Sequence, residues 1–396
     1  MRALLLCASH NDLGLILSLK KLGYEVIAIG SIPGLIGEKY ADKYIQLDYS
    51  DKDRVLELVR ELRIDAVCQC CNDYGVYTAA YVAEQMGLKG YDSYETTLLL
   101  HNKDKFKQFA LAHDITTPKS VGYSDIEQAY ADIENRDYPL IIKPVDASAG
   151  NGISKVDSCE EARAAIKAAF DKSRDKRIVI EPYISGTQHG FCTFLVDRKV
   201  VAYCSNNEYS IQNPYRVEID TFPAENDEEV RKRLIYEIEK MAELLKLADG
   251  IFHLQYIMAD HTPYIIEVMR RVLGNMYSVP ARLVSGFDWD YWETRAKCGL
   301  SCKNIHGFAQ EGFYAYKTIL AKENGIITNI RIPDSYQKYL VDRCFIKSVG
   351  DVIEKCDSTP IGFLFFIFSS QQEMKQVLIE NYIDTLVEIK ANEREA

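Results

Sequence analysis

The first 97 residues alternate between apolar runs of strand length and amphipathic segments of helix length. Strands are predicted at residues 2–8, 25–30 and 65–71, and helices at 13–23 and 75–87. Strands separated by helices favour a βαβ arrangement around a parallel sheet. The turn after the first strand reads Ala-Ser-His-Asn-Asp-Leu-Gly and lacks the G-x-G-x-x-G spacing of dinucleotide-binding folds. We therefore expect a scaffold that contributes to a substrate pocket, without an NAD site.

The middle of the chain carries two helix starts with recognisable capping residues. Asn102 stands where a side chain can cap the helix that opens with Lys103. Ser158 and Glu161 form an S-x-x-E capping box before a second helix. Strands are predicted across residues 177–204, and a long amphipathic helix at 227–247 precedes a last pair of strands.

One lysine interrupts the apolar strand predicted around residues 138–145, and a loop of small residues follows it. Lys143 is this lysine, and the loop spans residues 146–154. Small residues let backbone N–H groups approach phosphate oxygens, and a fixed ammonium neutralises their charge. The alternative is an ordinary core strand whose lysine reaches water, with glycines that only turn the chain. The pattern alone leaves both interpretations open.

Polar side chains alternate with apolar ones in the two strands predicted at residues 252–258 and 264–271. The short turn between them makes a hairpin, so Gln255, Glu267 and Arg271 would converge above one face. A hairpin with one solvated face shows the same alternation. The order of the parts along the chain has to decide between these alternatives.

Beyond residue 300 the pattern is mixed. Strands are predicted at residues 312–320, 325–331 and 361–369, and a helix at 371–381. No internal repeat is found. A chain of 396 residues exceeds one comfortable hydrophobic core, which favours two or three domains.

Composition and charge narrow the classes of function. The chain is 47% hydrophobic and 27% charged, with a formal charge of −11. An acidic chain is not expected to present a general surface for nucleic acid or anionic membranes, so an anion would be bound in a local pocket. The apolar run at the N-terminus is too short for a signal peptide or a spanning helix, and we expect a cytoplasmic protein. The 11 cysteines are scattered, which favours reduced thiols, and Cys68–Cys71 lacks partners at zinc spacing.

Four features in order resemble the ATP-grasp superfamily: a helix that opens with lysine, a strand lysine before a small-residue loop, the sequence V-I-E-P-Y-I-S-G-T-Q, and a hairpin that ends in I-I-E-V-M-R-R. The resemblance is greatest to the carboxylate–amine (amino-acid) ligase branch, related to biotin carboxylase and the large subunit of carbamoyl-phosphate synthase. It covers nearly the whole chain and implies an α/β (α+β) ATP-grasp fold. Its parts would be a leading Rossmann-like domain at 1–97, an ATP-grasp core at 98–300 with a mobile lid at about 117–196, and a β-rich α+β subdomain at 301–396.

The resemblance also implies how ATP is held. Lysines would contact the phosphates, a flap would close over them, and further residues would lie beside the adenine and the ribose: Lys103, Lys143, Ser148, Ala149, Gly150, Asn151, Gly152, Glu181, Ile184 and Gln188. Glu181 matches the carboxylate that meets the adenine amino group, with the Ile184 backbone beside it. Gln188 stands where the family usually has a ribose-binding glutamate, and an amide can still bond a hydroxyl.

The metal-binding positions depart from the family pattern. Glu267 matches the principal Mg²⁺ carboxylate, and Arg271 matches the arginine that steadies the transferred phosphate. Gln255 stands where a second metal glutamate is common, and Met269 where an asparagine is usual. Mg²⁺ accepts an amide oxygen but not a thioether, so we expect one ion, with a second site doubtful.

By this resemblance the protein would be an ATP-dependent ligase that activates a carboxylate as an acyl-phosphate and joins it to an amine, with release of ADP and phosphate. Its partners would be small-molecule acid and amine substrates, and a homodimer would be in keeping with such ligases. Tyr209, Tyr215 and Arg216 are candidates for gripping the acid, although a solvated aromatic loop has the same composition. The departures at Gln188, Gln255 and Met269 leave an alternative, an ATP-binding sensor or accessory protein without turnover. Chemistry like that of carbamoyl-phosphate synthase or a carboxylase would share the same ATP site.

Overall fold

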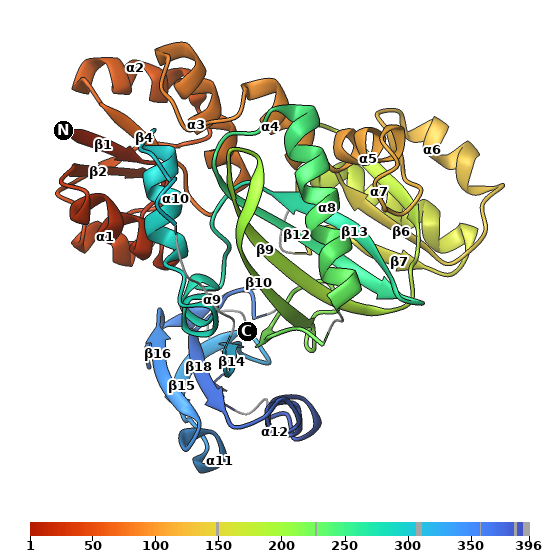
Figure 1. The fold of residues 1–396 in the computed structure, drawn as a ribbon. Helices are drawn as coiled ribbons and strands as arrows, with labels where there is room; N and C mark the ends of the chain where they lie inside the picture. The colour runs from red at the N-terminus through yellow and green to blue at the C-terminus, as the bar shows by residue number, and fades with distance from the viewer. Residues whose placement is uncertain (148–149, 226–227, 306–310, 357, 384–385, 391–396) are drawn as a thin grey trace.

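A computed structural model of the chain describes residues 1–147, 150–225, 228–305, 311–356, 358–383 and 386–390 (Figure 1). Ser148 and Ala149, two residues implied for the flap, lie outside this part. Within it the strands form four sheets. No helix among the described residues is both long and apolar enough to cross a bilayer.

The leading segment forms the parallel sheet that the βαβ pattern predicts. Its strand order is β3-β2-β1-β4, built from β1 (Arg2–Leu5), β2 (Glu25–Gly30), β3 (Lys43–Gln46) and β4 (Ala66–Cys68). One face packs on α2 (Lys52–Leu62) and α3 (Asp73–Met86), and the other on α1 (Leu13–Lys21) and α10 (Trp289–Lys297). Helices on both faces satisfy the requirement of a parallel sheet to be buried on both sides. One of these helices, α10, comes from a distant part of the sequence.

The centre of the molecule is an eight-stranded antiparallel sheet in the order β13-β12-β9-β10-β11-β14-β18-β16. Its strands are β9 (Thr187–Val196), β10 (Lys199–Tyr209), β11 (Ile219–Phe222), β12 (Gly250–Ala259), β13 (Thr262–Met269), β14 (Phe313–Ile319), β16 (Leu340–Phe345) and β18 (Gly362–Phe368). One face packs against the long helix α8 (Glu228–Leu245) and against α4 (Tyr94–His101) and α5 (Lys103–Ala112). The opposite face packs against α9 (Ser278–Ser285), α10 and the leading domain. The sheet therefore contacts the leading domain and the core helices, and it includes strands of the trailing segment.

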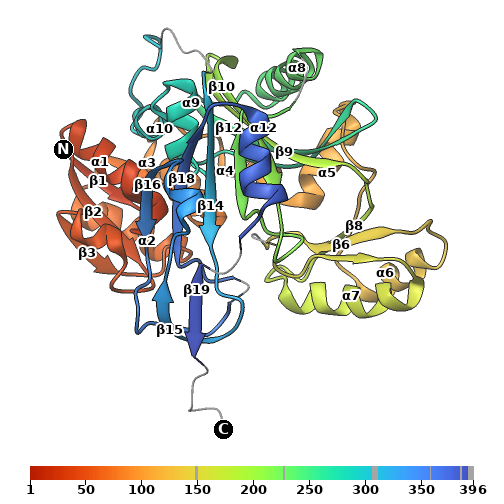
Figure 2. The ribbon, with the colours of Figure 1, turned by 90° about the horizontal axis from the view of Figure 1, so that it is seen from below.

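A smaller sheet stands apart from the central one, at the right of Figure 1 and again in Figure 2. Its order is β5-β8-β6-β7, from β5 (Val121–Tyr123), β6 (Leu140–Pro144), β7 (Ser154–Val156) and β8 (Ile178–Pro182). Helices α6 (Ile126–Ile133) and α7 (Cys159–Lys172) cover one face with an apolar core of their own. Strand β9 falls inside the range predicted for the lid but belongs to the central sheet.

The trailing segment forms the strands predicted at 312–320, 325–331 and 361–369, and its described residues add three further strands that were not predicted. These strands are divided between two sheets. Strands β14, β16 and β18 extend the central sheet, and β14 pairs directly with β11. Only β15 (Gly325–Ile330), β17 (Val352–Ile353) and β19 (Val387–Lys390) form a separate three-stranded sheet, beside α11 (Asp334–Gln337) and α12 (Gln371–Lys375). The joining strands bury an ion pair between Lys317 and Glu218, whose Nζ and Oε1 atoms lie 2.8 Å apart.

Candidate active site

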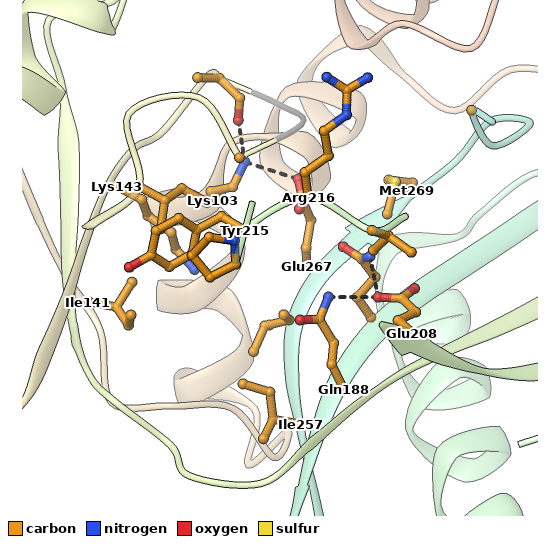
Figure 3. A pocket seen from close by; sticks show the side chains of 18 of the residues that line it. Lys103, Ile141, Lys143, Gln188, Glu208, Tyr215, Arg216, Ile257, Glu267 and Met269 are labelled. Carbon is orange, nitrogen blue, oxygen red and sulfur yellow. Dashed lines mark hydrogen bonds and ion pairs between the residues drawn. The ribbon is translucent and has the colours of Figure 1, made fainter. Parts of the chain in front are cut away.

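A cavity of about 430 Å³ opens between the small sheet and the β12–β13 hairpin of the central sheet (Figure 3). Its lining includes most of the residues implied for ATP, metal and phosphate: Lys103, Lys143, Gly150, Glu181, Ile184, Gln188, Gln255, Glu267 and Arg271. Asn151 and Gly152 follow Gly150 on the loop without being part of the wall. Residues spread over almost 170 positions of sequence therefore meet at one place.

The hairpin register explains how its polar side chains come together. Gln255 lies opposite Glu267, and His253 lies opposite Met269. Side chains directly across an antiparallel pair are neighbours on one face. A register shift after Gln255 still leaves Ile257 on the wall of the cavity. The predicted convergence of Gln255, Glu267 and Arg271 is confirmed, and the solvated-hairpin alternative does not apply.

Both predicted phosphate-binding lysines are buried and paired with carboxylates. Lys103 Nζ lies 3.0 Å from Glu267 Oε1 and donates to the Ala147 carbonyl at 2.8 Å. Lys143 Nζ lies 2.5 Å from Glu181 Oε1. Burial alone would lower the pKa of Lys103, but the Glu267 carboxylate outweighs it and raises this pKa overall. Both ammonium groups are therefore held in place by a carboxylate, beside a loop that can present backbone N–H groups.

A third lysine, which the sequence reasoning missed, lies behind the pair. Lys107 follows Lys103 by four residues on α5, is fully buried, and lies 3.7 Å from Glu181 Oε2. Burial lowers the pKa of Lys107 to about 7 despite this partner. Glu181 is also buried, yet Lys143 and Lys107 lower its pKa to about 2, with help from the Ser120 hydroxyl that donates to it. The i, i+4 spacing of the two α5 lysines was the signal available in the sequence.

The helix that carries these lysines starts differently from the prediction. Asn102 precedes α5, but its side chain makes no cap and its amide donates to the Leu98 carbonyl of the preceding helix at 2.9 Å. The predicted Asn102 side-chain cap is wrong, because α4 ends directly at this residue and offers a carbonyl acceptor. The backbone N–H of Lys103 instead donates to the Val145 carbonyl at 3.3 Å. This bond ties the first turn of α5 to the end of β6, so that both lysine-bearing elements share a contact.

Glu208 on β10 is a second residue that sequence reasoning missed. Its Oε2 accepts a hydrogen bond of 2.7 Å from the amide of Gln188 and another of 2.7 Å from the amide of Gln255. Burial raises the pKa of Glu208. Figure 3 shows it on the same side of the cavity as Met269. Its alternation with Asn206 along one strand was the only sequence signal, and any half-buried strand would give it.

The side-chain donors on the cavity wall determine whether it can hold the Mg²⁺ that the resemblance implies. The described part of the chain contains no group of three or more His, Cys, Asp or Glu side chains placed to hold a metal ion. The wall does offer the Glu267 and Glu208 carboxylates and the Gln255 amide, all hard oxygen donors. These residues fit one ion that completes its shell with phosphate oxygens and water, and Met269 adds no suitable donor.

The loop at residues 210–217 closes the cavity from the side of β10. Tyr215 and Arg216 line the wall, whereas Tyr209 packs among the apolar residues of the trailing segment. The Tyr215 hydroxyl accepts a hydrogen bond of 2.7 Å from the Lys155 backbone. A methyl group added at Gly150 would meet the Tyr215 carbonyl at 2.6 Å. The loop is therefore packed closely against the glycine-containing loop that follows Lys143.

Comparison with known proteins matches this geometry. The family model for the ATP-grasp domain matches residues 101–275, a range that holds the Lys103 helix, the glycine loop and the β12–β13 hairpin. The chain carries an ATP-grasp domain. Of the residues that line the cavity, all but Cys71, Tyr277 and Tyr316 lie inside this range.

Similar proteins share the domain at modest identity. The chain is 27% identical over 168 residues to the formate-dependent phosphoribosylglycinamide formyltransferase of Synechococcus sp. (strain CC9605), covering 42% of this chain and 43% of that protein. It is 22% identical over 297 residues to the carbamoyl phosphate synthase large chain of Clostridium acetobutylicum, covering 69% of this chain and 26% of that one. The chain thus spans less than half the length of these curated relatives.

A solved structure extends the likeness of the fold to the whole chain. The L-amino acid ligase from Bacillus licheniformis superimposes with a TM-score of 0.81 at 19% identity, covering 99% of both chains. At this identity the likeness concerns the fold. The predicted ATP-grasp architecture is confirmed.

Proposed function

We propose that the protein is an ATP-dependent ligase that activates a small-molecule carboxylate as an acyl-phosphate and joins it to an amine. The observation that carries this proposal is the meeting of Lys103, Lys143, Glu267 and Arg271 on one cavity. The two lysines come from different elements, and they face the Glu267 carboxylate and the Arg271 guanidinium. A triphosphate and its transferred phosphoryl group require such an arrangement of cations and a metal-binding carboxylate.

The nucleotide is proposed to lie along the small-sheet side of the cavity. Ile141 and Ile257 line the cavity and offer apolar side chains for a base; both are labelled in Figure 3. Glu181 and the Ile184 backbone offer acceptor and donor groups for the base edge. ATP phosphates would replace the carboxylate partners of Lys103 and Lys143, so the pairs in the free protein hold the ammonium groups ready.

Glu267, together with Gln255 and Glu208, would hold the magnesium ion. When bound, the ion supplies neutralisation of phosphate charge. Glu267 would act in both states: its carboxylate pairs with Lys103 in the free protein and would bind the ion when the nucleotide is present.

The chain's own residues are proposed to act by position and charge. A carboxylate oxygen of the acid attacks the γ-phosphorus and ADP leaves. The amine nitrogen then attacks the acyl carbon, the acyl C–O bond breaks, phosphate departs, and the nitrogen gives up a proton. Arg271 and the two lysines bear the charge that spreads over the transferred group. The loops around Gly150 and Tyr215 exclude water, which would otherwise hydrolyse the acyl-phosphate.

The test is release of ADP and phosphate from Mg²⁺-ATP with amino-acid and amine pools added one at a time. Lys143→Ala serves as the blank. Lys199→Ala is the matched control, because Lys199 is a surface lysine 60% exposed and paired only with Glu239 among the described residues. Release that depends on a pool, persists in Lys199→Ala and disappears in Lys143→Ala is expected. Release that is equal in all three proteins would contradict the proposal.

A further inference from the structure

Two consecutive arginines directly follow β13 and have different surroundings. Arg270 is buried and pairs with Asp92, with its Nε 2.8 Å from Asp92 Oδ2, and it donates to backbone carbonyls of the Ala248–Ile251 segment. Arg271 lines the cavity. Arg270 does not line the cavity, so only Arg271 of the pair can act there. The other arginine stabilises the end of the strand.

Arg271 is anchored by a residue of the leading domain. Its Nε lies 2.7 Å from Oδ1 of Asp73, the first residue of α3, and its Nη1 donates to the Val272 carbonyl at 3.2 Å. Both side chains of this pair are largely buried, with 8% and 14% exposed. Among the described residues, Nη2 has no hydrogen-bond acceptor, so that group remains available to a ligand. Asp73 thus fixes the guanidinium while leaving part of its donor set unused.

His101 in turn fixes Asp73. His101 Nδ1 lies 3.0 Å from the same Oδ1 atom, and Nε2 lies 3.2 Å from the Arg270 backbone nitrogen. A backbone N–H can only donate, so Nε2 must accept and Nδ1 carries the proton that is donated to Asp73. The Tyr77 ring lies edge-on to the imidazole at 5.9 Å. The carboxylate therefore receives hydrogen bonds from a cation on one side and from an imidazole of fixed tautomer on the other.

We propose that Asp73 is the positioning residue of Arg271, and that the leading domain thereby completes the phosphate-transfer site. The inference rests on the proposed function, because it assigns Arg271 to the transferred phosphoryl group. A free arginine side chain samples many rotamers, and a site that stabilises a transition state needs its donors placed before the reaction. An anchor at Nε removes that freedom without using the Nη2 donors that would meet phosphate oxygens. Both charged groups are ionised in this pair, since Arg271 lowers the pKa of the buried Asp73 carboxyl.

The test uses Mg²⁺-ADP with and without fluoroaluminate, a mimic of the phosphoryl group in transfer, measured by isothermal titration calorimetry on the full chain. Asp73→Asn removes the charge of the anchor. Asp92→Asn is the matched control, because it breaks the carboxylate–arginine pair of the neighbouring residue Arg270. That pair is even more deeply buried, and its arginine does not line the cavity. Among the described residues, neither the Asp73 nor the Asp92 side chain is hydrogen-bonded to a residue proposed to hold ADP.

We expect fluoroaluminate to tighten ADP binding in the wild type and in Asp92→Asn. In Asp73→Asn this gain should fall at least tenfold while the Kd of ADP alone stays within twofold. Asp73→Glu, which restores a carboxylate, should recover part of the gain. If Asp73 had only a structural role, restoring the charge would not be expected to recover this gain. A full gain in Asp73→Asn, or an equal loss in Asp92→Asn, would overturn the inference.

Should Asp73→Asn fail to fold, the same measurement is made on Asp73→Glu and on His101→Gln, which loses the donor at the Nδ1 position. In both variants the gain in ADP affinity from fluoroaluminate should be smaller than in the wild type. An unchanged gain in both would overturn the inference. Failure of the proposed function is separate, since fluoroaluminate would then not tighten ADP binding in the wild type or in Asp92→Asn.

Discussion

At the scale of single residues, the cavity holds cations that are already satisfied by carboxylates. Lys103 is paired with Glu267, and Lys143 with Glu181. Buried charges without partners are costly, so these pairs make a preformed cationic site tolerable in the absence of a ligand. Binding of a triphosphate would exchange one set of anionic partners for another, which limits the desolvation that binding has to overcome.

Met269 offers a test of the metal assignment by gain of affinity. Met269→Asn places an amide oxygen where the thioether stands, and we expect Mn²⁺ to bind severalfold more tightly in the presence of ADP. Electron paramagnetic resonance of free Mn²⁺ during titration measures this affinity directly. Met269→Leu changes the side chain without adding an oxygen and should bind Mn²⁺ like the wild type. Equal affinities in all three proteins would place the ion away from β13.

Glu181 predicts a specific dependence of stability on pH. Its pKa is about 2 in the folded protein against a reference value of 4.5, chiefly because Lys143 and Lys107 overcome the effect of burial. Between these two values the unfolded chain binds more protons, so the contribution is complete above about pH 4.5 and is lost as the pH falls towards 2. A shift of this size corresponds to roughly 3 kcal/mol.

Glu181→Gln does not titrate, so its deficit in unfolding free energy relative to the wild type should be largest at pH 7 and shrink below pH 4.5. Urea unfolding at pH 7, 4.5 and 3 measures it. A deficit that stays constant with pH would show that the lysines do not depress the pKa of this carboxyl.

At the scale of elements, two loops pack on each other over the cavity. Gly150 adopts a φ of +76° and lies against the Tyr215 backbone. Gly34 has a similar φ of +80° with open space around it. The two glycines therefore share the conformational requirement and differ only in their surroundings.

Gly150→Ala and Gly34→Ala should each lose about 1 kcal/mol of unfolding free energy from the strained backbone. Only Gly150→Ala should also weaken ATP binding, by tenfold or more, because the added methyl pushes the two loops apart. Chemical denaturation and calorimetric titration with ATP separate these effects. Equal ATP affinity in both variants would show that the contact between the loops plays no part in holding the nucleotide.

How far the sequence predicted these elements depends on the range of the contacts. The leading parallel sheet and the β12–β13 hairpin follow from local periodicity, and both are confirmed. Glu208 was missed because its partners Gln188 and Gln255 come from other strands. The pairing of β11 with β14 was missed for the same reason: alternation defines the faces of a strand but does not say which strand lies beside it.

At the scale of the whole molecule, the domain that matches the ATP-grasp family does not form the cavity alone. The leading domain supplies Cys71 to the wall and Asp73 to Arg271, and the trailing segment supplies Tyr316. The β14 strand that carries Tyr316 belongs to the same continuous sheet as the hairpin. The architecture thus places residues from the leading, central and trailing parts of the chain around one site.

The most direct measurement of the central claim follows oxygen from the acid to the phosphate. The protein would be incubated with Mg²⁺-ATP, an amine pool and amino acids labelled with ¹⁸O in their carboxyl groups, and the released phosphate analysed by mass spectrometry. Activation through an acyl-phosphate predicts one ¹⁸O atom in each phosphate, because the acyl C–O bond breaks and its oxygen stays on phosphorus. Release of unlabelled phosphate from an acid that stimulates ADP formation would contradict the account.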